Sequence, residues 1–295
     1  MSIIIILHFN SERNLGFILA LRYNLPGNHL LMRKENRTQG SLWTEQLQNR
    51  IVRIYRRQEQ EYMKFLTGAY WDCGQQLCNQ DSITIQQVMT SRGRVLMAIV
   101  CDGIGGLWKG EVASGYVIER MVACFYRQIV DLIGKGRRAS FMEKSIMRCL
   151  YSINEEFCRY RKGKEEQLGT TMSLLLIWGH RYLICHIGDS RIYRCRKKRM
   201  ELLTTDHSGG GHRLLKCMGS FPFQKPDIRR GRVRKKQGFL LCTDGFYNKQ
   251  CWGEMFEPAS ILEEGQIERR LQENAAYVKK QGEKDNLSAI YIRTC

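Results

Sequence analysis

The chain has 295 residues, enough for one large domain or two small ones, and its hydrophobic fraction of 43% can fill a substantial core. This composition excludes an intrinsically disordered chain, and no stretch approaches the ~20 consecutive apolar residues that span a bilayer. The formal net charge of +18 is large and positive. Residues 1–7 are apolar but lack a basic region and a cleavage site, so we expect no signal peptide and a cytoplasmic protein.

Cysteines and basic residues are both abundant. The 12 cysteines show no C-x-x-C pair and no framework spacing, and many lie in apolar runs, which predicts free thiols in a reducing compartment. Basic residues cluster at 194–199 and 225–236. This charge is either a solvated surface on strand ends and hairpin loops or a surface that attracts phosphorylated or acidic partners. Because no nucleic-acid motif accompanies it, we expect no nucleic-acid partner, and no membrane.

The first 62 residues differ from the rest of the chain. Residues 33–61 are rich in Arg, Gln, Glu and Asn, and apolar residues recur there at helical spacing, which favours a basic amphipathic helix or a loosely ordered extension. We therefore divide the chain into an N-terminal extension, 1–62, and a catalytic domain, 63–295. Translation from Met32 or Met63 is an alternative, because nothing in the extension carries chemistry.

Strands and amphipathic helices are expected in turn along the catalytic domain. The predicted strands are 83–89, 94–101, 170–178, 181–186, 191–196, 200–204, 238–242 and 287–292, with turns at 91–93 and 179–180. The predicted helices are 111–133, ended by Gly134 and Gly136, then 141–160 and 267–280. Strands that pair in hairpins, with helices inserted as long excursions, indicate an α+β fold of antiparallel sheets covered by helices.

Four short blocks with aspartate follow one another in this domain. They read Asn79-Gln80-Asp81, Asp102-Gly103-Ile104-Gly105-Gly106, Thr243-Asp244-Gly245 and Asp285-Asn286. Between them lie Gly169-Thr170-Thr171 and Gly188-Asp189-Ser190-Arg191. Most of these aspartates end an apolar run. A carboxylate at the tip of a buried strand lies at the rim of the core, where several carboxylates can converge around hard cations.

The order of these blocks resembles that of the metal-dependent serine/threonine protein phosphatases of the PPM, or type 2C, family in their bacterial form, over about residues 65–292. The resemblance implies a four-layer α/β/β/α sandwich of two antiparallel sheets flanked by helices, with the metal site at one end of the sheets. It also implies a hydrolase for phosphoserine and phosphothreonine, in which a metal-activated water attacks phosphorus in line without a covalent phosphoenzyme. The implied partner is a phosphorylated protein substrate, and we expect a monomer.

The same resemblance implies two Mn²⁺ or Mg²⁺ ions and a weaker third site. Asp102 would be the bridging carboxylate, with the Gly103 carbonyl as a further ligand, and Asp244 and Asp285 would complete the shell of the first ion. Asp81 would act on the side of the second ion through bound water, so the catalytic set is Asp81, Asp102, Asp244 and Asp285. Asp189 either helps to hold the third ion with Asp244 or only fixes the turn before Arg191.

Three departures from the family pattern stand beside these matches. Gln80 occupies the place of a common glutamate, which removes one negative charge from the side of the second ion. No arginine precedes Asn79 to bind the substrate phosphate, and Ile104 stands where eukaryotic members have a histidine. The segment 208–212, where the family inserts a flap, is short. Gln80 and the missing arginine leave open the alternative of a catalytically weak phosphatase-like binding or regulatory module.

Overall fold

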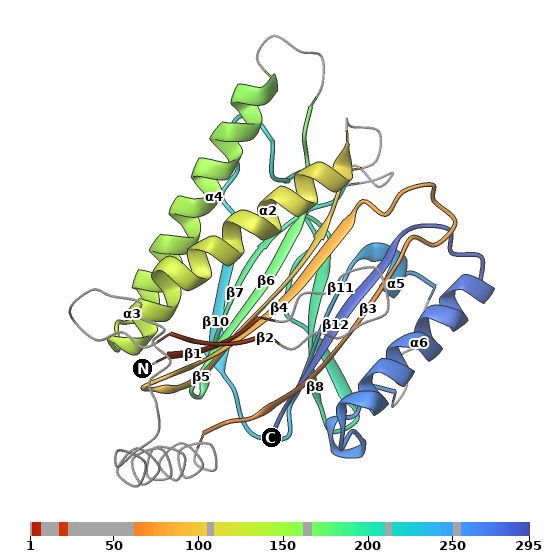
Figure 1. The fold of residues 1–295 in the computed structure, drawn as a ribbon. Helices are drawn as coiled ribbons and strands as arrows, with labels where there is room; N and C mark the ends of the chain where they lie inside the picture. The colour runs from red at the N-terminus through yellow and green to blue at the C-terminus, as the bar shows by residue number, and fades with distance from the viewer. Residues whose placement is uncertain are drawn as a thin grey trace, which may run out of the picture.

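The structure is a computed structural model that describes residues 62–104, 109–161, 167–209, 214–249 and 255–295, and the backbone of two strands at 2–6 and 18–22. Two antiparallel sheets lie face to face, with helices on both outer sides (Figure 1). This is the predicted four-layer α/β/β/α sandwich, and the α+β fold class is confirmed. Residues 33–61, for which a helix or loose extension was predicted, lie outside the described residues.

The first sheet contains seven strands. Their spatial order is β10 (Asp227–Arg232), β7 (Arg181–Ile187), β6 (Met172–Trp178), β5 (Gly93–Asp102), β4 (Asp81–Thr90), β1 (Ser2–Ile6) and β2 (Ile18–Arg22). β1 pairs with β4, with Ile4 opposite Val88, so the start of the chain widens this sheet. The division at residue 62 stays a prediction about domain organisation.

The second sheet contains five strands. Their order is β3 (Phe65–Asp72), β12 (Leu287–Thr294), β11 (Gly238–Cys242), β8 (Arg191–Arg196) and β9 (Arg199–Leu202). Every predicted strand of the catalytic domain is present, with ends shifted by a few residues. The edge strands β3 and β10 were not predicted, and the basic cluster that was taken as loop or strand end contains β10.

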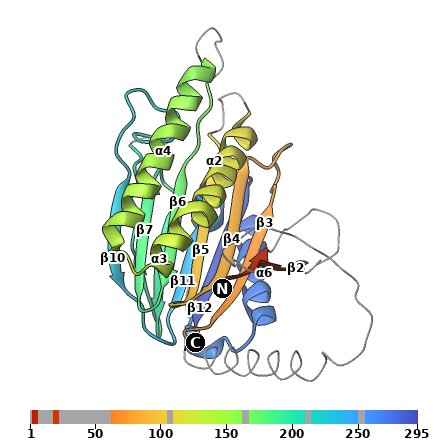
Figure 2. The same ribbon diagram turned by 60° about the vertical axis from the view of Figure 1, so that its left-hand side comes forward.

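Helices cover each sheet from outside. α2 (Gly110–Cys124), a π-helical turn (Phe125–Ile129), α3 (Val130–Gly134) and α4 (Ala139–Arg161) lie over the first sheet (Figure 2). α6 (Glu264–Lys280) covers the second sheet, and α5 (Asp244–Tyr247) and a 3₁₀ turn (Pro258–Ser260) precede it. The single helix predicted for 111–133 is therefore interrupted by a π-helical turn, which apolar spacing alone does not reveal.

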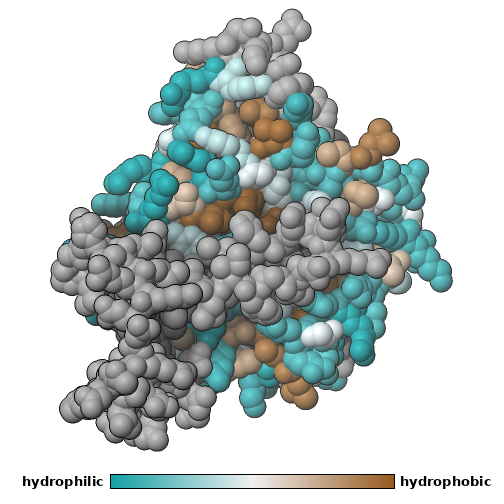
Figure 3. All heavy atoms as spheres, viewed as in Figure 1, coloured by the Kyte–Doolittle hydropathy of each residue, from teal (hydrophilic) through white to brown (hydrophobic). Residues whose placement is uncertain are grey.

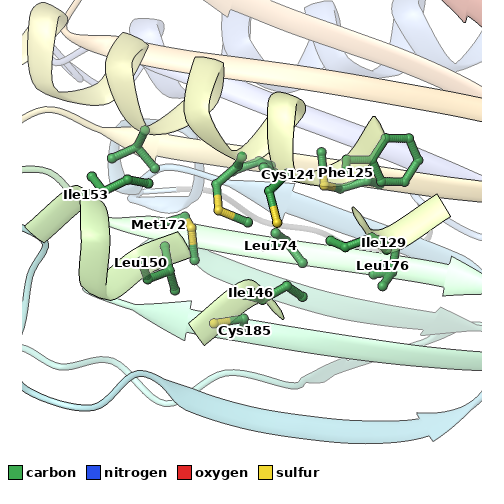
Figure 4. Packing of buried hydrophobic residues seen from close by; sticks show 14 of the residues in the cluster. Cys124, Phe125, Ile129, Ile146, Leu150, Ile153, Met172, Leu174, Leu176 and Cys185 are labelled. Carbon is green, nitrogen blue, oxygen red and sulfur yellow. The ribbon is translucent and has the colours of Figure 1, made fainter. Parts of the chain in front are cut away.

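Three hydrophobic clusters fill the spaces between the four layers. Met97, Ile99 and Cys101 of β5 face the helices, whereas the alternating residues Leu96 and Val100 face the second sheet. Because both faces of β5 are buried, its sequence is a continuous apolar run rather than an alternating one. Figure 4 shows the cluster between the helices and the first sheet, in which Cys124 of α2 and Ile146 and Leu150 of α4 pack with Leu174 of β6. The third cluster joins α5 and α6 to the second sheet.

On the face that Figure 3 shows, the described residues are mostly hydrophilic, and apolar residues form separate patches among them. Among the described residues, no helix is both long and apolar enough to cross a membrane.

Candidate metal and catalytic site

The predicted site residues lie at the same end of the two sheets. Asp81 is the first residue of β4 and Asp102 the last of β5, and the antiparallel register places them opposite each other. In the second sheet, Asp244 follows β11 and Asp285 precedes β12, and the pairing of Cys242 with Ala289 brings these two ends together. The sequence thus delivers each carboxylate to a strand tip because the apolar run before or after it is buried in the sandwich.

A buried hydrogen bond joins the two halves of this site. Thr243 Oγ1 donates to Asp81 Oδ2 at 2.8 Å, and Asp81 is only 2% exposed. Thr243 is held in turn by Ser288, because its amide donates to the Ser288 carbonyl at 3.0 Å and its hydroxyl accepts from the Ser288 amide at 3.1 Å. Thr243 was not among the predicted site residues, yet it positions the carboxylate of the first sheet from the second sheet.

The carboxylates also interact electrostatically. Burial raises the pKa of Asp81 to about 7, and the charges of Asp244 and Asp285 add to this effect. Burial likewise raises the pKa of Asp244 to about 6, with further contributions from Asp285 and Asp189. The pKa of Asp102 is raised by burial first, and then by Asp81, Asp244, Asp189 and Asp285. All five predicted carboxylates therefore belong to one electrostatic cluster, since a like charge nearby disfavours ionisation.

The donors of this cluster suit a hard divalent cation. Buried oxygens Oδ1 of Asp81 and Oδ1 of Asp244 have no hydrogen-bond partner, and an unpaired buried polar atom costs free energy unless something compensates it. Mg²⁺ and Mn²⁺ prefer carboxylate and carbonyl oxygens. Within the described ranges, no three His, Cys, Asp or Glu side chains already form a metal-binding group, so the ligand set stays a prediction.

Gly103 has a structural reason to be glycine. A Cβ at this position would lie 2.4 Å from the Gly110 carbonyl oxygen and 2.7 Å from the Gln80 carbonyl oxygen. The Gly103 amide donates to that Gln80 carbonyl at 3.1 Å. The close approach of α2 and of the Gln80 backbone therefore leaves no room for a side chain at this position.

The second residue of the Asp285-Asn286 block fixes the loop before Asp81. Asn286 Nδ2 donates to the carbonyls of Cys73 and Cys78 at 3.0 and 3.2 Å, and its Oδ1 accepts from the Gln80 amide at 2.8 Å. Ser114 of α2 donates to the Gln80 carbonyl at 2.6 Å. Asn286 and Ser114 therefore position the loop, a role that the short motifs in the sequence do not reveal.

Asp189 lies beside Asp244 in a pocket of about 310 Å³ whose walls also include Arg191, Asp206 and Tyr247. Its backbone carbonyl accepts a hydrogen bond from the Tyr247 hydroxyl at 3.2 Å. The preceding Gly188 has φ +114°, and a Cβ there would lie 2.4 Å from Thr171 Cβ. The turn is thus fixed by Gly188 and Tyr247. The charge of the Asp189 carboxylate raises the pKa of Asp102 and of Asp244. Both interpretations of Asp189 stay open.

Arg191 does not replace the absent phosphate-binding arginine. Its guanidinium forms an ion pair with Asp206, with Nη2 at 2.6 Å and Nε at 3.0 Å from the two carboxylate oxygens, and stacks over the Tyr247 ring at 3.8 Å. Such a bidentate and stacked arrangement holds the side chain in one place. A larger pocket of about 660 Å³ lies against β10 and contains none of the predicted site residues.

Comparison with known proteins settles the family. A family model described as protein phosphatase 2C matches residues 73–290. The chain belongs to this family. The recognition made from the sequence motifs is confirmed, and so is its class: a serine/threonine protein phosphatase, which is a hydrolase. The alternative of a binding module is not favoured.

Individual relatives agree with this assignment. The chain is 25% identical over 230 residues to a serine/threonine phosphatase stp of Listeria innocua, covering 70% of this chain and 87% of that one. It is 28% identical over 142 residues to the protein phosphatase PhpP of Streptococcus pneumoniae, covering 46% of this chain and 53% of that one.

Solved structures show the same fold. The serine/threonine phosphatase of S. agalactiae matches with a TM-score of 0.66 at 20% identity, over 79% of this chain and 99% of that chain. The catalytic domain of PstP, crystallised with two manganese ions, matches with a TM-score of 0.62 at 21% identity, over 79% and 99%.

Proposed function

We propose that this phosphatase hydrolyses phosphoserine and phosphothreonine in proteins with two divalent cations, Mn²⁺ or Mg²⁺, at the aspartate end of the sandwich. The observation that carries the proposal is the carboxylate cluster at this end of the sheets, in which the buried Oδ1 atoms of Asp81 and Asp244 have no hydrogen-bond partner. When bound, such a cation pair would lower the pKa of a water molecule and neutralise charge on the phosphate.

Each aspartate has a distinct proposed role. Asp102 is the shared ligand, supported by its position opposite Asp81 and by the charges of Asp81, Asp244 and Asp285, which raise its pKa. The Gly103 carbonyl, Asp244 and Asp285 complete the first cation site. Asp81 serves the second cation through water, and the hydrogen bond from Thr243 leaves its Oδ1 available for that purpose.

A weaker third cation between Asp189 and Asp244 belongs to the same proposal. These two residues line one pocket, and the charge of Asp189 raises the pKa of Asp244. The manganese ions named for the PstP domain favour Mn²⁺ as the first cation to test.

Phosphate capture is the weak step of the proposed reaction. Arg191 is engaged with Asp206, and the exposed loop around Gln76 contains no arginine. We expect a raised KM with retained turnover, because loss of a charge-assisted hydrogen bond of ~1.5–3 kcal/mol implies roughly ten- to hundredfold poorer capture.

The deciding experiment is hydrolysis of p-nitrophenyl phosphate and of a phosphothreonine peptide by the full chain with Mn²⁺, Mg²⁺ or EDTA. We expect turnover that EDTA abolishes and Mn²⁺ restores. If no metal-dependent turnover exceeds that of Asp102→Asn at any substrate concentration, the binding-module alternative is correct.

A crystal structure with Mn²⁺ tests the ligand set separately. We expect the carboxylates of Asp102, Asp244 and Asp285 to reach a common ion. If they lie more than about 10 Å apart with Mn²⁺ present, the proposed site does not exist, because direct ligation requires oxygens at ~2.0–2.6 Å.

A further inference from the structure

Two cysteines of neighbouring helices face each other over the first sheet. Cys124 is the last residue of α2 and Cys149 lies in α4, and both views in Figures 1 and 2 show these helices side by side. The Cys124 thiol contacts the Ser145 carbonyl at 3.8 Å, and the Cys149 thiol contacts the Arg120 carbonyl at 3.7 Å.

These two contacts are reciprocal, and reciprocity places the sulfurs together. Ser145 is four residues before Cys149, and Arg120 is four residues before Cys124. In an α-helix, the carbonyl four residues back lies one turn below the side chain that leans over it. Each thiol therefore contacts a backbone carbonyl that lies next to the other cysteine's side chain, so the two sulfur atoms lie close together.

Both cysteines line one pocket of about 230 Å³. Three arginines share its wall: Arg120, Arg127 and Arg148. Cys149 is partly exposed, whereas Cys124 is buried. An electropositive, partly exposed surrounding is the environment in which a cysteine thiolate forms and reacts.

The electrostatics distinguish Cys149 from the core cysteines. Hydrogen bonding with Cys124 lowers the pKa of Cys149. The charge of Arg120 lowers it further, whereas burial and the charge of Glu156, which forms an ion pair with Arg120, oppose the shift. The same hydrogen bond, followed by burial, raises the pKa of Cys124. Burial raises the pKa of Cys185 and Cys242, which makes those thiols inert.

We propose that Cys149 and Cys124 form a peroxide-oxidisable dithiol, with Cys149 as the attacking thiol and Cys124 as the resolving thiol. The Cys149 thiolate attacks one oxygen of hydrogen peroxide, an S–O bond forms, the O–O bond breaks, and the released hydroxide takes up a proton to leave as water. The Cys124 sulfur then attacks the sulfenic acid, an S–S bond forms, the S–O bond breaks, and a second water leaves. The two thiols lose two electrons in total, and the peroxide is reduced to two waters.

The test is peptide mass mapping of the full chain after treatment with hydrogen peroxide. Remaining thiols are alkylated after unfolding in urea, because Cys124 is buried in the folded chain, and the protein is digested without reduction. We expect a disulfide-linked peptide that joins Cys124 to Cys149, and loss of alkylation at both residues together. Cys158→Ser is the matched control, because Cys158 lies on the same helix and is also partly exposed. This variant should form the same linked peptide.

Two single variants test the order of the steps. Cys124→Ser should retain a sulfenic acid at Cys149 that dimedone labels, whereas Cys149→Ser should leave Cys124 unlabelled and alkylatable only on unfolding. In the wild-type chain, Cys149 should be alkylated by iodoacetamide at pH 7 faster than Cys158, which tests the assignment even if a variant fails to fold. Absence of the linked peptide while the exposed Cys73 and Cys78 become oxidised would overturn the proposal. These readouts do not depend on phosphatase activity.

Discussion

At the scale of single residues, the proposed site depends on one shared carboxylate, Asp102, and on several others that assist it. Asp102 is opposite Asp81 in the first sheet and feels the charges of Asp244, Asp285 and Asp189. Asp189 influences only part of this cluster. The two positions should therefore respond differently to the same chemical change.

Replacing Asp102 by Asn keeps the shape of the side chain but removes the charge. We expect kcat to fall by about 10²–10³-fold or more, the scale on which a single group that stabilises transition-state charge acts. Asp189→Asn should leave a measurable rate that needs more Mn²⁺ for saturation. The measurement is kcat as a function of Mn²⁺ concentration for both variants, and equal activity of Asp102→Asn and wild type would refute the mechanism.

The missing phosphate-binding arginine can be restored in the loop before Asn79. Gln76 and Leu77 are exposed there. Either Gln76→Arg or Leu77→Arg should lower KM by roughly ten- to hundredfold while changing kcat less, as expected for binding energy that substrate and transition state share. The readout is a Michaelis curve on a phosphothreonine peptide in excess Mn²⁺.

Leu262→Arg provides the control for added charge, because Leu262 is also an exposed leucine but lies just before α6. Its KM should stay at the wild-type value. If both leucine variants lower KM equally, the gain comes from general attraction by a more basic protein and not from a restored phosphate contact.

His186 gives a residue-scale prediction about pH. Burial lowers its pKa to about 4 from an ordinary 6.5, and the stacked His207 ring adds to this effect. The neutral ring lies 2.9 Å from Ser173 Oγ and 3.0 Å from the Thr205 carbonyl oxygen. Because the unfolded chain binds the proton more readily between pH 6.5 and 4, His186 stabilises the protein above that window, and this stability is lost as the pH falls through it.

The expected loss is roughly 2–4 kcal/mol of unfolding free energy across that window. Urea unfolding at several pH values should show a flatter pH dependence for His186→Asn than for the wild type. His180→Asn, at the exposed turn between β6 and β7, should keep the wild-type slope. A His186→Asn profile parallel to the wild type would contradict the assigned role.

At the scale of elements, close packing of a helix on an edge strand depends on a glycine. Gly68 of β3 has no Cβ, and one placed there would lie 2.5 Å from Ile267 Cγ2 of α6. Gly265, in the first turn of the same helix, has nothing within 4 Å of an added Cβ. A side chain at Gly68 would therefore clash with α6, whereas one at Gly265 would meet no neighbouring atom.

Gly68→Ala should destabilise the protein by about 1–3 kcal/mol, because α6 must move off β3 to admit the methyl group. Gly265→Ala should leave stability unchanged or raise it by ~0.5–1 kcal/mol, since alanine favours the helix. The urea midpoints of both variants check this difference. Equal midpoints would mean that α6 adjusts freely on the sheet.

At the scale of the whole molecule, the sequence predicted the inner strands of the two sheets except β1, together with the edge strand β9, but not the edge strands β2, β3 and β10. Runs such as residues 95–101 are apolar throughout because the strand is covered on both faces, and such runs stand out in any sequence. Strand β10 was missed because it is an edge strand whose arginines are exposed, and charged residues on edges discourage pairing with other chains. Strand β3 is also an edge, and its glycine and polar ends weaken the strand pattern.

The site was predictable to a similar degree. Aspartates at strand tips appear in the sequence as carboxylates that follow apolar runs, so Asp102 and Asp244 could be proposed as site residues from the sequence alone. The supporting bonds were not predictable, because Thr243 and Asp81 lie 162 positions apart and Asn286 and Gln80 lie 206 positions apart. Only the packing of the two sheets brings these partners together.

The bond from Thr243 to Asp81 also has a consequence for how the chain folds. Each sheet can form its hairpins from local segments, but the site needs contacts between segments that are far apart, and closing such long loops is slow. During refolding, secondary structure should therefore recover before enzymatic turnover does. The time at which activity appears would then report when one sheet docks on the other, so a turnover assay would follow the last stage of folding.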